Sequence, residues 1–169
     1  MRSTLNFNSH WQFTKPGAAP VAVTLPHTWN AADGTDGGND YFRGICTYTR
    51  EFAAPAHADD EEVWLEFEGA AMTAVVTLNE QELTRHAGGY STFRVNLTPA
   101  LAAQNTLTVT VDNSANRTVY PQKADFTFYG GLYRDVHILI VPHSHFALGN
   151  HGAPALRVTP EVSDDLHSA

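Results

Sequence analysis

The chain has 169 residues, with 10 Lys and Arg against 18 Asp and Glu, and its formal net charge at pH 7 is −8. This length predicts one domain that can bury a core, and a second full domain is not expected. The acidic balance and the scattered arginines argue against nucleic acid or an anionic membrane as a partner, because phosphate binding needs clustered Lys and Arg.

Alternation of apolar and polar residues dominates the chain and predicts half-buried β-strands. The pattern is clearest from Asn105 to Asn113, where Leu107, Val109 and Val111 alternate with threonines. In chain order, strands are predicted at 45–52, 63–67, 74–78, 93–97, 105–113 and 136–141, with turns at 79–81, 88–89 and 112–113. A shorter strand-like stretch is expected at 156–159.

One short helical segment is predicted between two of these strands. Thr98 supplies an N-cap, Pro99 suits the first turn, and residues 100–104 continue for about one and a half turns of good helix formers. No long apolar stripe with helical spacing accompanies it, so this segment is expected to be a crossover. The predicted fold class is therefore all-β, with two antiparallel sheets packed face to face in a jelly-roll sandwich.

Two long segments, 24–43 and 113–131, do not read as strands. Both are rich in Gly, Asn, Asp and aromatic residues, and loops of such length in a compact domain are usually functional or disordered. In the second loop, Asp125 lies five residues ahead of Gly130-Gly131, among aromatic rings. A carboxylate beside rings suits a sugar, because the ring covers the C–H face while the anion accepts hydrogen bonds from hydroxyl groups.

The first loop ends in Asn39-Asp40-Tyr41-Phe42-Arg43, which offers an amide, a carboxylate, two rings and a guanidinium. Asn39 and Asp40 are therefore candidates for ligand contact. Arg43 could equally bridge to Asp40 and pin the loop, so the ligand-binding and structural interpretations both remain open.

Other reactive residue types have structural interpretations. Cys46 shares a strand face with Tyr48 and is expected to be a buried, inert thiol, which cannot form an internal disulfide. His143 and His145 would lie on one face of a strand with geometry that suits a metal, but no third ligand is evident. They are expected to be an exposed pair.

The acidic residues do not suggest a complete pair of catalytic carboxylates, which a glycosidase needs across a cleft. Residues 59–62 are expected to form a solvated turn, and Glu66 and Glu68 a solvated strand face. No cationic leader opens the chain, and no apolar run approaches the roughly 20 residues that span a bilayer. With one cysteine, a cytoplasmic location without membrane contact is expected.

Five blocks in a fixed order resemble the N-terminal sugar-binding domain of glycoside hydrolase family 2, the family of β-galactosidases, β-glucuronidases and β-mannosidases. The resemblance covers almost the whole chain. The blocks are Leu25-Pro26-His27-Thr28-Trp29-Asn30, the run from Tyr41-Phe42-Arg43-Gly44 to Tyr48-Thr49-Arg50-Glu51-Phe52, Phe67-Glu68-Gly69-Ala70, Val76-Thr77-Leu78-Asn79 and Gly130-Gly131-Leu132-Tyr133-Arg134-Asp135-Val136. Residues 152–162 also resemble the join to the second, immunoglobulin-like domain.

This resemblance implies a galactose-binding-domain-like jelly roll at residues 1–142, and a linker with the start of an immunoglobulin-like domain at 143–169. It also implies a downstream TIM barrel that carries both catalytic glutamates. Such a barrel takes about 250 residues and alternating helices, so this chain alone is expected to be inactive. No cofactor is expected in this chain, whereas the full-length enzyme could use a divalent or monovalent cation and could form a homo-oligomer.

In β-galactosidases of this family, an Asp ten residues ahead of the aspartate in the Arg-Asp pair reaches the substrate sugar from the first domain. Asp125 matches that spacing to Asp135. The family also has an Asn contact from the earlier loop, for which Asn39 is the second candidate. A β-galactoside or related saccharide is therefore the expected ligand of the parent, a retaining exo-β-glycosidase. The alternatives are a stand-alone carbohydrate-binding module and a β-sandwich that binds another protein.

Overall fold

The structure is a computed structural model that describes residues 2–33, 41–120, 127–149, 152–153 and 155–164. Within these residues the regular elements are strands and one short 3₁₀ helix. They are β1 (Ser3–Asn6), β2 (Trp11–Thr14), β3 (Val21–Val23), β4 (Ile45–Ala53), β5 (Glu61–Phe67), β6 (Thr73–Leu78), β7 (Gln81–Ala87), β8 (Phe93–Asn96), η1 (Thr98–Ala100), β9 (Gln104–Asp112) and β10 (Val136–Pro142).

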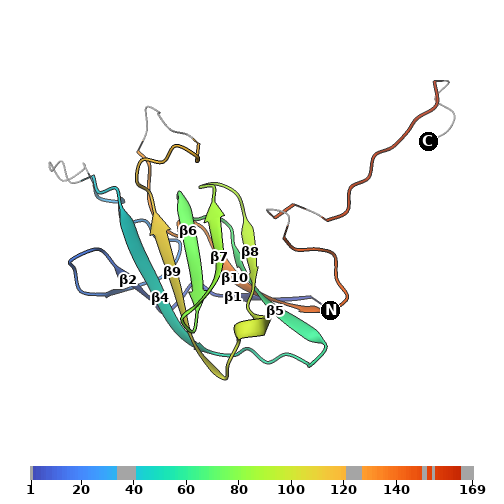
Figure 1. Ribbon diagram of the computed structural model, residues 1–169, viewed down its shortest axis with the longest axis horizontal. Coiled ribbons are helices and arrows are strands. Elements are labelled where there is room, and N and C mark those ends of the chain that lie inside the picture. Colours follow the sequence, from blue (N-terminus) through green and yellow to red (C-terminus); the bar gives the residue numbers. More distant parts are fainter. Residues whose placement is uncertain (1, 34–40, 121–126, 150–151, 154, 165–169) are drawn as a thin grey trace.

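The strands form two antiparallel sheets that pack face to face (Figure 1). The strand order is β1-β10-β5-β8 in the four-stranded sheet and β3-β2-β4-β9-β6-β7 in the six-stranded sheet. The predicted antiparallel sandwich is thus confirmed. No helix among the described residues is long and apolar enough to cross a membrane.

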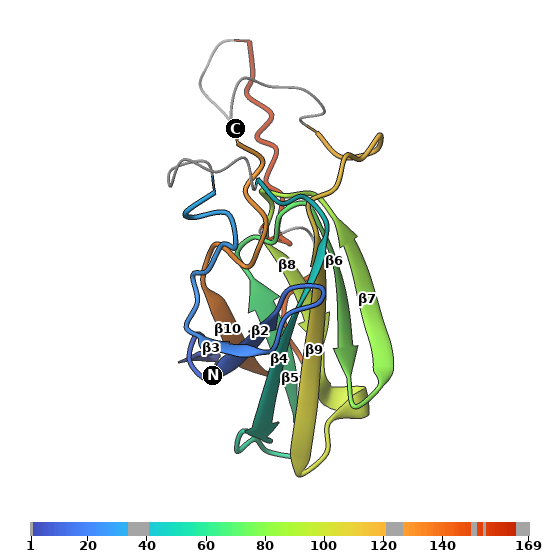
Figure 2. The same cartoon turned by 90° about the vertical axis from the view of Figure 1, so that its left-hand side faces the viewer.

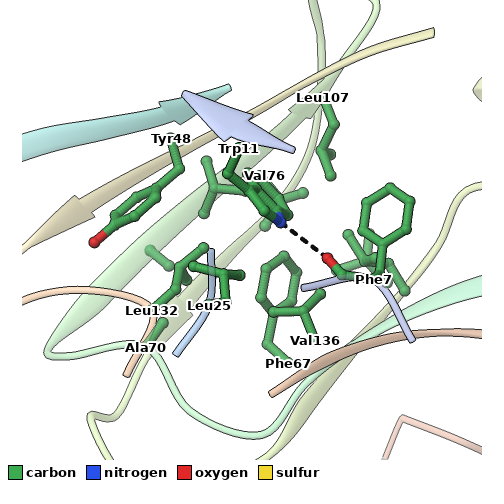
Figure 3. Packing of buried hydrophobic residues seen from close by; sticks show 14 of the residues in the cluster. Phe7, Trp11, Leu25, Tyr48, Phe67, Ala70, Val76, Leu107, Leu132 and Val136 are labelled. Carbon is green, nitrogen blue, oxygen red and sulfur yellow. Dashed lines mark hydrogen bonds between the residues drawn. The ribbon is translucent and has the colours of Figure 1, made fainter. Parts of the chain in front are cut away.

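The core lies between the sheets and follows from the alternation in the sequence. Trp11, Tyr48 and Phe67 are fully buried there, together with the inward-facing residues of β6 and β9 (Figure 3). The indole Nε1 of Trp11 donates a hydrogen bond to the carbonyl of Phe7 at 2.9 Å, so its one polar atom is satisfied. Burying each such side chain contributes about 1.5–3 kcal/mol, which makes this layer the main source of stability.

The predicted helix at 98–104 is wrong in length. Only Thr98–Ala100 forms a single 3₁₀ turn, and Gln104 already begins β9. The hydroxyl of Thr98 does not cap the turn, because it accepts a hydrogen bond from the Val63 amide at 2.9 Å instead. A contact across to β5 therefore replaces the local cap on which the prediction depended.

Four strands were not predicted: β1, β2, β3 and β7. The exposed β1 and β3 have no buried face to impose an apolar period, and β7 follows the Asn79-Glu80 turn at a sheet edge. Conversely, the strand-like stretch expected at 156–159 forms no strand in its described residues. Leu156 and Val158 are exposed there.

The interpretation of Glu66 as a solvated residue is also wrong. Its carboxylate is buried and lies 2.5 Å from Nε of Arg94, whose Nη1 donates to the carbonyl of Leu148 at 3.0 Å. The chain after β10 therefore covers this part of the outer face of the four-stranded sheet. His143 and His145 follow the end of β10 and do not share a strand face, and Nδ1 of His145 lies 2.9 Å from the carbonyl of Pro142.

Candidate sugar-binding loops

The two long loops come together at one end of the sandwich. The antiparallel register pairs Ile45, at the start of β4, with Asp112, at the end of β9. The loop before β4 and the loop after β9 consequently leave the sheet side by side, at the upper end in Figure 2. The β6–β7 hairpin and η1 lie at the opposite end.

Gly130 and Gly131 pass directly beneath the first loop. A Cβ at Gly130 would lie 1.9 Å from Cζ2 of Trp29, and one at Gly131 would lie 2.4 Å from the carbonyl oxygen of His27. Gly131 also has a φ of +133°, which favours glycine. The paired glycines therefore allow a close approach of two backbones, which docks the second loop on Trp29.

Beside the glycines lies a largely apolar recess of about 380 Å³. Its lining residues come from three segments that are separate in the sequence, so no single motif predicts it. Tyr90 and Tyr129 are half exposed at its edge, whereas the Tyr133 hydroxyl donates to the carbonyl of Gly89. Its described lining residues are Ala71, Met72, Tyr90, Thr127, Phe128, Tyr129 and Tyr133. Exposed rings around an uncharged hollow suit the C–H face of a sugar.

Arg43 and Tyr41 fasten the first loop to the second. Nε of Arg43 donates to the carbonyl of Asn113 at 2.7 Å, and its guanidinium lies 4.5 Å from the ring centroid of Phe128. The amide of Phe128 donates to the hydroxyl of Tyr41, and burial raises the pKa of that hydroxyl. Of the two interpretations left open for Arg43, these contacts support the structural one, although Asp40 itself is outside the described residues.

The three residues predicted to bind the sugar, Asp125, Asn39 and Asp40, all lie outside the described residues. Their neighbours Phe128 and Tyr41 are in contact, so the structure brings together the ends of the segments that carry them. Tyr90 and Met72 of the recess were missed by the sequence analysis. The Gly88-Gly89 pair directly before Tyr90 was the available signal, but it was interpreted only as a turn.

Cys46 is buried as expected, and burial raises the pKa of its thiol to about 11, which makes it a poor nucleophile at neutral pH. One group among the described residues, Glu68, Asp135 and His137, places three possible metal-ligand atoms within 4.8 Å of one another. His137 Nε2 lies 3.2 Å from Glu68, and Asp135 accepts a hydrogen bond from Asn8 Nδ2 at 2.9 Å. These contacts account for the cluster without an ion.

Residues 41–158 match the family model described as the glycosyl hydrolase 2 galactose-binding domain-like domain. The chain belongs to this family. It is 31% identical over 166 residues to a β-glucuronidase of Bacteroides fragilis, covering 95% of this chain and 24% of that protein. It is 24% identical over 160 residues to a β-galactosidase of Thermoanaerobacter pseudethanolicus, covering 85% and 22%.

A crystal structure of an FMN-binding β-glucuronidase from Faecalibacterium prausnitzii L2-6 matches 98% of this chain and 26% of that chain, with a TM-score of 0.87 and 41% identity. A β-glucuronidase of Bacteroides uniformis matches with a TM-score of 0.81 and 36% identity, covering 90% and 19%. The chain thus spans about a quarter of the length of the curated relatives named above. The predicted family, as the N-terminal domain of such glycosidases, is confirmed.

Proposed function

We propose that this chain is the sugar-binding domain of a longer retaining exo-β-glycosidase, and that its two loops form one wall of the substrate pocket. The observation that carries this proposal is that the described ends of the two loops dock on each other next to an aromatic recess whose described lining is uncharged. The catalytic glutamates belong to a downstream TIM barrel, where one acts as nucleophile and the other as acid and base.

The substrate class is a terminal β-glycoside. β-Glucuronides are the first candidate, since relatives at 41%, 36% and 31% identity are named β-glucuronidases. β-Galactosides, the substrate expected from the sequence, are the second, supported by the β-galactosidase relatives. The described lining of the recess carries no charged residue, and the nearest cation to it among the contacts above is the Arg43 guanidinium on the Phe128 ring.

The proposed domain boundary follows the end of β10 at Pro142. Beyond it, Phe146, Leu156, Val158 and Val162 are exposed by 54–77% of their surface. Apolar side chains at such spacing are expected to pack in a following immunoglobulin-like domain. A cytoplasmic location remains part of the proposal, on the ground that the single Cys46 is free and buried.

The test is the Asp125→Ala substitution in the full-length protein, assayed with nitrophenyl β-glucuronide and nitrophenyl β-galactoside. Loss of a hydrogen bond to a charged group costs about 1.5–3 kcal/mol, so kcat/KM should fall about 10- to 150-fold on the preferred substrate. Asp59→Ala, in the turn before β5, is the control and should leave kcat/KM unchanged. A change within twofold for Asp125→Ala would refute its assignment.

Binding measurements on the isolated 169-residue chain distinguish the two rival functions. A stand-alone binding module should bind a saccharide in calorimetry, whereas a domain that supplies one wall of a shared pocket should bind weakly or not at all. A protein-interaction sandwich would instead leave the glycosidase activity of the full-length protein unaffected by substitutions in the two loops.

A further inference from the structure

Two asparagine side chains are buried where the loops meet. Asn30 is 1% exposed and Asn113 is fully buried. Burial of an amide is unfavourable unless its donors and acceptors are satisfied. Here every polar atom of both amides has a partner, and the two side chains also bond to each other, from Asn113 Nδ2 to Asn30 Oδ1 at 3.2 Å. Such a network fixes one arrangement of its surroundings.

Asn30 Nδ2 donates to the carboxylate of Asp33 at 2.5 Å, and the other partners outside the pair are backbone groups in two loops that are distant in sequence. Asn30 Nδ2 donates to the carbonyl of Phe42 at 2.8 Å, and Asn113 Oδ1 accepts from the amide of Gly44 at 2.8 Å. These bonds fix the chain entering β4. The backbone adds one bond of its own here, from the amide of Asn113 to the carbonyl of Gly44 at 3.3 Å, and the side chains extend this pairing beyond the end of the β4–β9 ladder.

The remaining bonds bracket one residue of the recess. Asn113 Nδ2 donates to the carbonyl of Phe128 at 2.9 Å, directly before Tyr129. Asn30 Oδ1 accepts from the amide of Gly130 at 2.7 Å, directly after Tyr129. The backbone of Tyr129 is therefore held on both sides, while its half-exposed ring lines the recess.

We propose that Asn30 and Asn113 are positioning residues that hold the Tyr129 ring against the sugar. This inference rests on the proposed function and names the ring and the two amides that serve it. A Tyr ring carries few rotatable bonds, so fixing its backbone leaves little further freedom to lose when a ligand binds. The gain should appear in kcat/KM for the preferred glycoside.

The experiment is a double-mutant cycle in the full-length protein. Tyr129→Ala should lower kcat/KM about 10-fold and Asn113→Ala at least about 5-fold, and in the double variant the effect of Asn113→Ala should nearly vanish. Additive effects, or a Tyr129→Ala variant with unchanged kcat/KM, would overturn the proposal. If Asp125→Ala retains its effect in that case, the proposed function stands and only this inference fails.

The matched control is Asn105→Ala, at the far end of β9 and about 26 Å along the strand from Asn113. Asn105 is also a buried amide, 3% exposed, with bonds to the backbone of Ala102 and to Asn79. Its loss should lower thermal stability to a similar degree as Asn113→Ala without changing kcat/KM. An equal loss of kcat/KM in Asn105→Ala would mean that general destabilisation explains both variants.

A second readout does not depend on activity. In Asn30→Ala, which removes the acceptor of the Gly130 amide, hydrogen exchange at that amide should accelerate about 10-fold or more, while the amides in the middle of β9 remain protected. Unchanged exchange at Gly130 would also overturn the proposal. If Asn113→Ala does not fold, Asn113→Ser is the replacement, because a serine hydroxyl is too short to reach the Phe128 carbonyl in the same position.

Discussion

Replacement of Gly130 with alanine is expected to destabilise the domain by about 2–4 kcal/mol. The added Cβ would lie 1.9 Å from Cζ2 and 2.4 Å from Cε2 of the Trp29 indole, so one of the two residues must move. The indole cannot swing away without cost. It stacks on Phe13 at a centroid distance of 5.9 Å, and its Nε1 donates to the carbonyl of Phe42 at 3.3 Å.

The magnitude follows from these two losses. Overpacking a filled site costs typically about 1–3 kcal/mol, and a lost neutral hydrogen bond adds about 0.5–1.5 kcal/mol. For a chain of this size, each kcal/mol lowers the melting temperature by about 2–4 °C, so Gly130→Ala should melt about 5–15 °C below the wild type. Circular dichroism during heating and urea titration would measure both quantities.

Gly149→Ala is the matched control, because a Cβ there would meet no heavy atom within 4 Å. Its stability should stay within about 0.5 kcal/mol of the wild type. If Gly130→Ala were equally neutral, Trp29 would have room to move, and the second loop could not be docked against it as described.

Two further perturbations have definite expected outcomes. Burial lowers the pKa of His27 below its ordinary value of 6.5, and its Nδ1 lies 2.8 Å from the Tyr48 hydroxyl. Between the lowered pKa and 6.5, the unfolded chain binds more protons than the folded one, so the free energy of unfolding should fall as the pH decreases through this window. His27→Gln should weaken this pH dependence, which urea titrations at pH 7.5, 6.5 and 5.5 would measure. Arg94→Met should lower the free energy of unfolding by about 3–5 kcal/mol, because it leaves the Glu66 carboxylate buried without its partner. Adding Glu66→Gln to the same chain removes that buried charge and should recover most of the lost stability in urea titrations.

β9 was predicted most clearly, because its two faces differ in environment. In β9 the valines enter the core and the threonines face outward, so the sequence period records the burial directly. β1 is exposed on both faces, and no period marks it. Length matters as well, because the four residues of β2 alternate in burial and were still missed, whereas β10 was predicted from its nearly continuous apolar run.

The candidate site was predictable only in part, for a related reason. The paired glycines stood out in the sequence beside aromatic residues, but the indole of Trp29 that excludes a side chain at Gly130 comes from the other loop. Asn30 and Asn113 were not identified, since their roles depend on partners 83 and 100 residues away in the chain. Nothing in a single loop reveals that its asparagine will be buried against another loop.

The arrangement of the loops favours a shared pocket over a self-sufficient one. The recess is open at the edge where Tyr90 and Tyr129 are half exposed, and its described lining is uncharged. From the described lining a sugar would gain ring contacts but few hydrogen bonds, while it would lose its translational and rotational freedom in full. A neighbouring domain that closes the open side would supply the missing polar contacts. The rigid amide network beneath Tyr129 would be useful in that case, because a wall that is already ordered reduces the entropy lost when the pocket is completed by substrate.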